Sequence, residues 1–501
     1  MNTWNSLVKN ALLGTGNGFT PPAAPDTLQE TLTSISNDDR DVALLSTAAL
    51  IGVAYLAGRI PDKLNEFGEA SPLEAQQYIS DEASVFLKRI LDGEYQDVLP
   101  EFLSIASSLG HIVPPETLPA LLGLGRNKLR RSVLPVIGER GKWLARHNPS
   151  WTYALGREDE SDVWENGTRS ERVDLLERVR EYNAKHALEL IQSTWEVDPY
   201  EERAAFVATL RNSLSLEDEP FLETCLDDPR KEVRDATLDL LIRLPESRHS
   251  ARMAARLLPL LVYKSSILKG ATIQVTLPEQ VDANAKRDGV TGSAISKKMG
   301  KQANLLAQMI SLTPPSFWSQ KWNQTPEKLL QAALKSEWKE ALISGWYLGM
   351  VRSKDAEWAA AIAEMIVKQS GVQAITVEMD FRDLARLIPV ETFEELAQNS
   401  ILNTIKDLND NHPIFMLLEA YDIPWSDALS RTILSSIQRQ AGNSHWRLMR
   451  ALPAFALRVP VSLTETYITG WPNDSKSWGT WIDQFCAVLR FRRDMTDALR
   501  R

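Results

Sequence analysis

The segment 216–247, LEDEPFLETCLDDPRKEVRDATLDLLIRLPES, restricts the possible folds of this chain more than any other part of it. Asp228 is a favourable helix cap, and Pro229 suits the first position of the helix that follows. Small and apolar side chains then recur at helical spacing, which predicts one apolar helix face: Val233, Ala236, Thr237, Leu240, Leu241 and Leu244. Pro245 ends this helix, and a shorter apolar helix is expected over 220–226. Two helices joined by an aspartate turn form one supersecondary unit.

Related units recur upstream at a nearly constant interval. Arginines stand at intervals of 32, 31 and 31 residues, each one or two places after a glutamate and before an apolar helical pattern: Arg140, Arg172, Arg203 and Arg234. Glutamate and arginine are common in helices, so the turn, the cap and the apolar face support the repeat as much as the spacing does. A period in the low thirties with two helices per period is typical of an α-solenoid, and the Asp-Pro turn resembles HEAT-type repeats.

The predicted fold class is therefore all-α: an α-solenoid of HEAT-like repeats in two halves, with a short irregular or β-like insertion between them. The predicted regions are an N-terminal helical region (1–115), a repeat array (116–263), an irregular insertion and connector (264–315) and a tryptophan-rich helical region (316–501). More locally, we expect helices at 5–13, 41–57, 72–91 and 100–109, a loop or linker at 19–39, β-like segments at 271–277 and 373–379, and an exposed polar excursion at 278–301. Ten of the 15 tryptophans follow residue 316, and core filling is their expected role.

Composition excludes several classes of protein. The 44% apolar share can build a large core, and the net charge of −10 disfavours non-specific binding of nucleic acid. Only Cys225 and Cys486 occur, so we expect neither a disulfide framework nor a cysteine zinc site, which fits a reducing compartment. The N-terminus does not read as a signal peptide, and the apolar run 42–57 is shorter than a membrane span. We expect a cytoplasmic protein with no membrane association.

No motif in the sequence carries recognisable chemistry. The glycines of GTGNG (14–18) follow no strand and precede no Lys-Ser or Lys-Thr pair, so a helix stop is the better interpretation. The six histidines are scattered without metal-ligand spacing. We therefore expect no catalytic residues, no metal and no cofactor. A catalytic site assembled from distant residues stays open as an alternative.

The segment 123–151 is basic although the whole chain is acidic. It contains seven Lys or Arg residues and one acidic residue, Glu139. Its candidate binding residues are Arg126, Lys128, Arg130, Arg131, Lys142, Trp143, Arg146 and Trp151. A functional interpretation is a basic groove for phosphate, nucleic acid or an acidic segment of a partner. The alternative, which we favour, is a solvated face that pairs with acids of the neighbouring repeats.

Several segments together resemble a bacterial family of helical-repeat proteins of unknown function. They are LVKNALLGTG (7–16), GERGKWLARHNPSW (138–151), KRDGV (286–290), LLAQMISLTPPSFW (305–318) and ALPAFALRVP (451–460). The likeness spans nearly the whole chain. It implies an association with gene sets that also encode a MoxR-type AAA ATPase, a von Willebrand A-domain protein and a SWIM zinc-finger protein. It brings no catalytic residues with it.

Three functions follow as hypotheses. The first is a non-enzymatic protein–protein interaction scaffold or adaptor, with a MoxR-type AAA ATPase or von Willebrand A-domain protein as partner, because solenoids expose extended faces and need no catalytic apparatus. The alternative is a HEAT-like protein that binds nucleic acid through 126–147, including a DNA-repair-type enzyme. The third is an enzyme of a type that the motifs do not disclose.

Overall fold

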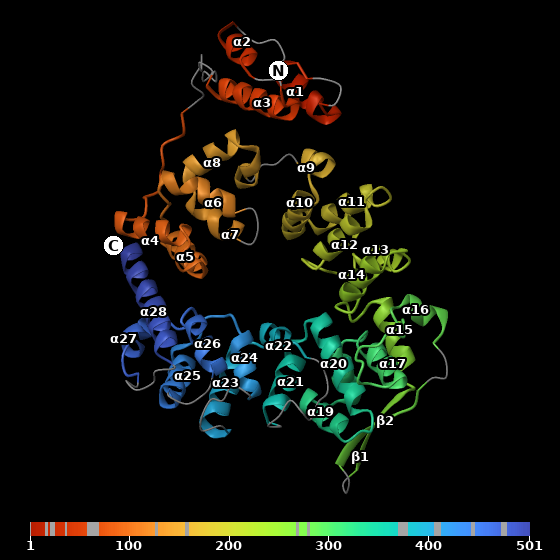
Figure 1. The fold of residues 1–501 in the computed structure, drawn as a ribbon. Helices are drawn as coiled ribbons and strands as arrows, with labels where there is room; N and C mark the ends of the chain where they lie inside the picture. Colours follow the sequence, from red (N-terminus) through yellow and green to blue (C-terminus); the bar gives the residue numbers. More distant parts are fainter. Residues whose placement is uncertain are drawn as a thin grey trace. The chain divides into compact units, whose positions relative to one another are not determined.

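The computed structural model describes residues 2–15, 19–20, 26–35, 38–57, 70–125, 129–155, 160–266, 270–277, 281–368, 379–404, 412–441, 446–471 and 478–501. Two compact units make up the chain, Met1–Ser71 (unit 1) and Pro72–Arg501 (unit 2). Both consist mainly of α-helices, as the sequence predicts (Figure 1).

The described part of unit 1 contains three helices, α1 (Asn2–Leu13), α2 (Asp26–Thr33) and α3 (Arg40–Ala57). Its buried apolar side chains are few: Leu7, Phe19, Leu32, Ala43 and Ile51. The predicted helices at 5–13 and 41–57 are confirmed as α1 and α3. The prediction of a loop over 19–39 is wrong at α2, because Leu28 and Leu32 stand four residues apart and pack into the core of unit 1.

Unit 2 begins with a run of short helices. They are α4 (Asp81–Leu91), α5 (Leu99–Ser108), α6 (Leu118–Leu124), α7 (Arg130–Val133), α8 (Gly138–His147), α9 (Glu160–Asn166), α10 (Arg169–Tyr182), α11 (Ala184–Thr194), α12 (Tyr200–Thr209), α13 (Glu219–Cys225), α14 (Lys231–Leu241) and α15 (Arg248–Leu257). A 3₁₀ helix, η4 (Pro149–Leu155), follows α8. The predicted helix at 72–91 starts only at Asp81, because the Ser80 hydroxyl caps it there, accepting from the Ala83 N–H at 3.1 Å.

A two-stranded antiparallel sheet follows α15. Strand β1 (Leu261–Ser266) pairs with β2 (Gly270–Val275), so that Leu261 lies opposite Val275 and Ser266 opposite Gly270. The β-like prediction at 271–277 is thus confirmed by β2, whereas β1 was not predicted. A short apolar run such as that of β1 fits a strand or a buried helix equally well.

Helices resume after the sheet. They are α16 (Ala283–Arg287), α17 (Lys301–Ile310), α18 (Pro315–Trp322), α19 (Pro326–Leu334), α20 (Lys339–Ser353), α21 (Ala356–Lys368), α22 (Phe381–Leu387), α23 (Val390–Asn399), α24 (Pro413–Ala420), α25 (Asp427–Gln440), α26 (Trp446–Phe455), α27 (Thr464–Tyr467) and α28 (Gly479–Arg500). Tryptophans fill the interior here, as expected: Trp318, Trp346, Trp358 and Trp478 are fully buried. The β-like segment predicted at 373–379 lies almost wholly outside the described residues.

Helices that stand two apart in the chain contact one another along long parts of unit 2. Helix α10 contacts α12, α12 contacts α14, and the series α19, α21, α23 and α25 continues the pattern. The predicted apolar face of 233–244 is confirmed on α14, where Val233, Thr237 and Leu241 are buried. The helix starts at Lys231, later than predicted, because Asp228 closes the preceding turn by accepting the Arg230 N–H at 2.8 Å.

Two of the recurring arginines bridge successive helices. Arg172 on α10 lies 2.9 Å from the Asp198 carboxylate and 2.7 Å from that of Glu202. Arg203 on α12 lies 3.0 Å from the Asp228 carboxylate. Ion pairs that are so little exposed to solvent specify which helices contact each other, but they add little to the net stability of the fold. At these two positions, therefore, the recurrence in the sequence marks contacts between one helix pair and the next.

The buried apolar side chains of unit 2 form two clusters. The small core extends from Ile79 to Ala154, and the large core from Trp164 to Leu489. Helix α28 belongs to both. Its first half contributes to the large core, and Phe491, Met495, Ala498 and Leu499 of its second half contribute to the small core.

Polar contacts fasten the second half of α28 to the start of unit 2. The Arg492 guanidinium donates to both oxygens of the Glu101 carboxylate on α5, at 2.6 and 2.7 Å. The Ser80 hydroxyl, at the cap of α4, donates to the Ala498 carbonyl at 2.7 Å. Figure 1 shows α28 beside α4 and α5. The last helix of unit 2 thus packs on its first two, and the path of contacts through the unit returns to its beginning.

The polar segment after the sheet is only partly exposed. The prediction of an exposed excursion at 278–301 holds at 291–294, 297 and 298 and is wrong at five buried residues, Ala285, Asp288, Val290, Ser296 and Met299. The Asp288 carboxylate is buried and lies 2.6 Å from Arg252 and 2.6 Å from Arg256, both on α15. Arg287 donates to the Asp227 carboxylate after α13. Burial raises the pKa of Asp288, but the hydrogen bonds from the two arginines of α15 outweigh it and lower the pKa below its ordinary value. These charges bind α16 to α13 and α15.

Candidate binding surface

Two arginines of the basic segment, the partly buried Arg130 and the exposed Arg131, have partners within the chain. Arg130 on α7 donates to the Tyr153 carbonyl at 2.8 Å and lies 3.8 Å from the Asp174 carboxylate on α10. Arg131 forms an ion pair with Glu181, also on α10. These contacts join the part of unit 2 that holds the small core to the part that holds the large core. Both side chains therefore have partners within the chain, as the alternative interpretation of the basic segment expects.

The other candidate residues are dispersed. Trp151 lies on η4, half-buried against the small core. Arg126 and Lys128 lie outside the described residues. Lys142, Trp143 and Arg146 lie together on α8.

Helix α8 has an unusual N-terminal anchor. The Glu74 carboxylate accepts hydrogen bonds from the backbone N–H groups of Glu139 and Arg140, both at 2.7 Å. A carboxylate at this position also compensates the positive end of the helix dipole. Gly138 has φ +60°, and a Cβ there would lie 2.5 Å from a Glu74 oxygen, so glycine is required. The Gly-Glu-Arg sequence thereby fixes where α8 begins.

The side of α8 away from the core carries cations and aromatic rings. Gly141 and Ala145 are buried on the inner side, whereas the outer side, here called the α8 face, consists of Arg140, Lys142, Trp143, Arg146 and His147. The Trp143 and His147 rings meet edge to face, with centroids 4.6 Å apart. Arg140 was not among the predicted binding residues, although its spacing of three from Trp143 and seven from His147 places it on this face.

Much of the positive charge of the α8 face is available to a ligand. Lys142 donates to Glu139 at 2.7 Å, and this hydrogen bond lowers the pKa of Glu139. The exposed side chains of Arg140 and Arg146 form no ion pair with any residue that the structure describes. Guanidinium groups recognise carboxylates and phosphates through paired hydrogen bonds. The α8 face is thus suited to binding an anion next to an aromatic edge.

An acidic groove lies between helices α19, α21 and α23. Its volume is about 480 Å³, and its lining includes Glu327, Glu364 and Glu395 around an apolar floor of Ala361 and Leu396. One cation, Lys368, lines the groove and pairs with Glu364. The sequence does not predict this groove, because its glutamates stand on three separate helices. Their alignment depends on helix packing, which no local pattern encodes.

Both cysteines and His249 are buried. Burial raises the pKa of the Cys225 thiol to about 12 and also raises that of Cys486. Burial lowers the pKa of His249, whose Nε2 lies 3.1 Å from the Asp288 carbonyl oxygen. Among the described residues, no group of three or more His, Cys, Asp or Glu is arranged to hold a metal ion. The α8 face and the acidic groove are therefore surfaces suited to binding by charge and shape.

Comparisons with known proteins place the chain in a family. The model of a family described as "Family of unknown function (DUF5691)" matches residues 6–499, so the chain belongs to this family. No curated protein and no solved structure matches the chain. Within the described part of the chain, no helix has both the length and the apolar character needed to cross a membrane.

Proposed function

We propose that this family member is a protein–protein interaction scaffold, built as an α-solenoid of HEAT-like repeats. The contacts between helices two apart, such as α10 with α12 and α12 with α14, support the repeat architecture. So do the ion pairs that Arg172 and Arg203 form with the following helices. Stacked repeats of this kind present extended surfaces to partners and depend on no catalytic group.

The α8 face is the observation that carries the proposal. It binds an acidic segment of a partner protein, with Arg140 and Arg146 receiving carboxylates and Trp143 covering apolar atoms beside them. Exposed ion pairs contribute only about 0.2–1 kcal/mol each. Most of the binding energy then comes from the tryptophan, which is among the residue types that dominate protein interfaces. The anchoring of α8 by Glu74 holds these groups in place before binding.

The kind of partner is part of the proposal. The family likeness in GERGKWLARHNPSW and the other segments associates such chains with a MoxR-type AAA ATPase and a von Willebrand A-domain protein. We propose that one of these supplies the acidic segment. Binding of nucleic acid is the competing function, since the α8 face also suits phosphate. Against it, Arg130 and Arg131 are paired with acids of α10, and the chain carries a net charge of −10.

A titration separates the two functions. Full-length protein is titrated against a fluorescent peptide rich in Asp and Glu, and against a short DNA duplex, at low and physiological salt. We expect the peptide to bind and Arg140→Glu with Arg146→Glu to weaken it about tenfold, the effect of about 1.4 kcal/mol from two lost ion pairs.

The matched control reverses two exposed lysines elsewhere, Lys297→Glu with Lys298→Glu, and leaves peptide affinity unchanged. Tighter binding of the duplex than of the peptide, lost in the α8 variant, would establish the competing function. Binding of neither probe, or equal losses in both variants, would refute the assignment to the α8 face.

A further inference from the structure

Helix α3 of unit 1 is apolar on the side that faces away from the core of unit 1. Its inner side buries Ala43, Thr47 and Ile51. The opposite side exposes a single stripe at intervals of three, four and four residues: Val42, Leu45, Ala49 and Val53. Leu45 is 69% exposed and Val53 65% exposed. An amphipathic surface helix normally carries polar side chains on its outer face, and this helix does not.

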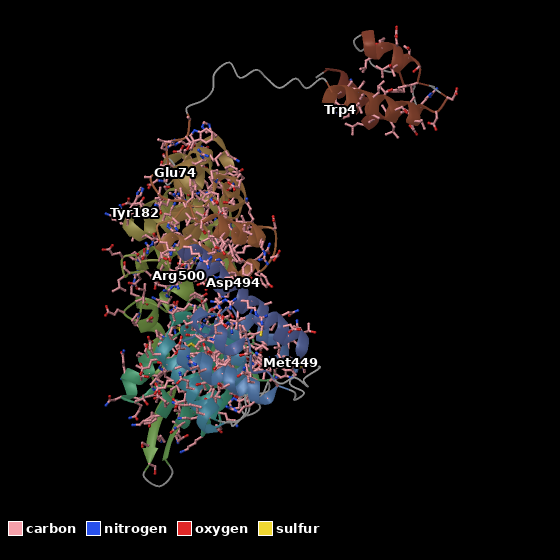
Figure 2. The ribbon with its side chains drawn as sticks, turned by 90° about the vertical axis from the view of Figure 1, so that its left-hand side faces the viewer. Trp4, Glu74, Tyr182, Met449, Asp494 and Arg500 are labelled. Carbon is pink, nitrogen blue, oxygen red and sulfur yellow. The ribbon has the colours of Figure 1, made fainter. Side chains whose placement is uncertain are left out.

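Helix α1 extends this apolar surface. Trp4, Val8 and Leu12 stand four residues apart and are all exposed. The α1 and α3 helices run antiparallel, because Trp4 lies beside Gly52 while the Thr15 hydroxyl donates to Asp41. Figure 2 labels Trp4 on α1. Contiguous apolar surface of this kind marks a place where another molecule docks.

We propose that the α3 stripe is a homodimer contact, in which α3 helices of two copies of this chain pack antiparallel about Ala49. The stripe is self-complementary under this symmetry. When Ala49 faces its counterpart, Leu45 of each copy faces Val53 of the other, four residues away on either side of the twofold axis. The smallest side chain of the stripe lies on the axis, which allows the two helices to approach closely.

The charges at the two ends of α3 favour the same orientation. The N-terminal end carries Asp38, Asp39 and Asp41 with Arg40, a net charge of −2. From residue 42 to residue 58 the sequence has no charged residue, and the next one is Arg59. Antiparallel packing keeps the two acidic N-terminal ends apart and opposes the two helix dipoles, whereas parallel packing places the acidic ends side by side.

Cysteine cross-linking in the full-length protein tests the register. We expect Ala49→Cys to form a disulfide-linked dimer under mild oxidation, because the two copies of this position meet on the axis. Leu45→Cys is the matched control. Its two copies lie eight residues apart along the helices, about 12 Å, beyond the roughly 7 Å that a disulfide spans between Cα atoms. The native cysteines Cys225 and Cys486 are buried, so the wild type serves as background.

Each outcome decides the proposal. Dimers of Ala49→Cys alone support it. Equal cross-linking of both variants means parallel or unspecific packing, and no cross-linking of either means that two copies do not meet at the stripe. Both of these results overturn the proposal.

A charge exchange tests the same contact without oxidation. Sedimentation equilibrium of the full chain should show Leu45→Lys weakening the dimer at least tenfold. Adding Val53→Glu to the same chain restores it, because each new lysine then faces a new glutamate across the axis. Both positions are exposed, so helix content measured by circular dichroism stays unchanged. A double variant as monomeric as the single one would contradict the antiparallel register.

Discussion

Met495 tests whether α28 joins the two cores of unit 2. Its side chain is fully buried in the small core, on a helix that packs against α4 and α5. Met495→Ala removes the thioether and leaves a cavity, which lowers the stability of that core by about 3 kcal/mol. Since about 1.4 kcal/mol corresponds to a factor of ten, local opening becomes on the order of 100-fold more frequent.

Hydrogen exchange followed by mass spectrometry measures this effect segment by segment. We expect faster exchange in α4, α5 and the second half of α28. Met350→Ala is the matched control, because Met350 on α20 is equally buried but belongs to the large core. It should accelerate exchange in α17 and α20 and leave α4 and α5 unchanged. If Met495→Ala leaves the exchange of α4 and α5 at the wild-type rate, α28 does not stabilise the small core and the reasoning fails.

Two further predictions concern the anchors of the fold. Gly138→Ala places a side chain in the left-handed backbone region and against Glu74, so the free energy of unfolding should fall by about 1–3 kcal/mol. A urea titration that gives the wild-type free energy of unfolding would contradict the role of Gly138 and Glu74 in fixing the start of α8. Asp288→Asn leaves Arg256 without its acid and Arg252 with Glu223 alone. It should cost about 2 kcal/mol at pH 7, less than for a fully buried pair because both arginines are partly exposed. The pKa of the Asp288 carboxyl is lower in the folded protein than in the unfolded chain. Its contribution to the free energy of unfolding is therefore fully present above the pKa of the unfolded chain, and it is lost as the pH falls through the pKa of the folded protein. The difference between wild type and variant should therefore persist down to about pH 4 and shrink below it, and a constant difference at all pH values would exclude an ionic origin.

The sequence predicted those elements whose signals are local. Helix α3 is a long uncharged run, α14 has a continuous apolar face, and β2 alternates, so each was found within a few residues of its observed bounds. The recurrence of Arg172 and Arg203 also corresponded to a physical contact, since both reach acids on the following turn.

The elements that were missed depend on distant partners. The segment around Asp288 is polar enough to suggest an exposed loop, and only the three-dimensional position of α15 shows that arginines neutralise it. The N-terminus of α8 is likewise held by Glu74, more than sixty residues earlier. No pattern within a single segment encodes such pairings. The same limit applies to the acidic groove, which exists only once three helices are packed together.

The central claim is that the protein binds another protein through the α8 face, and affinity purification from the native host tests it most directly. Three full-length proteins are compared by quantitative mass spectrometry: the wild type, Arg140→Glu with Arg146→Glu, and the control Lys297→Glu with Lys298→Glu. We expect partner proteins in near-stoichiometric amounts with the wild type and the control, and about tenfold less with the α8 variant. A wild-type protein that is recovered alone under gentle conditions, or the same partners in equal amounts from all three, would contradict the claim.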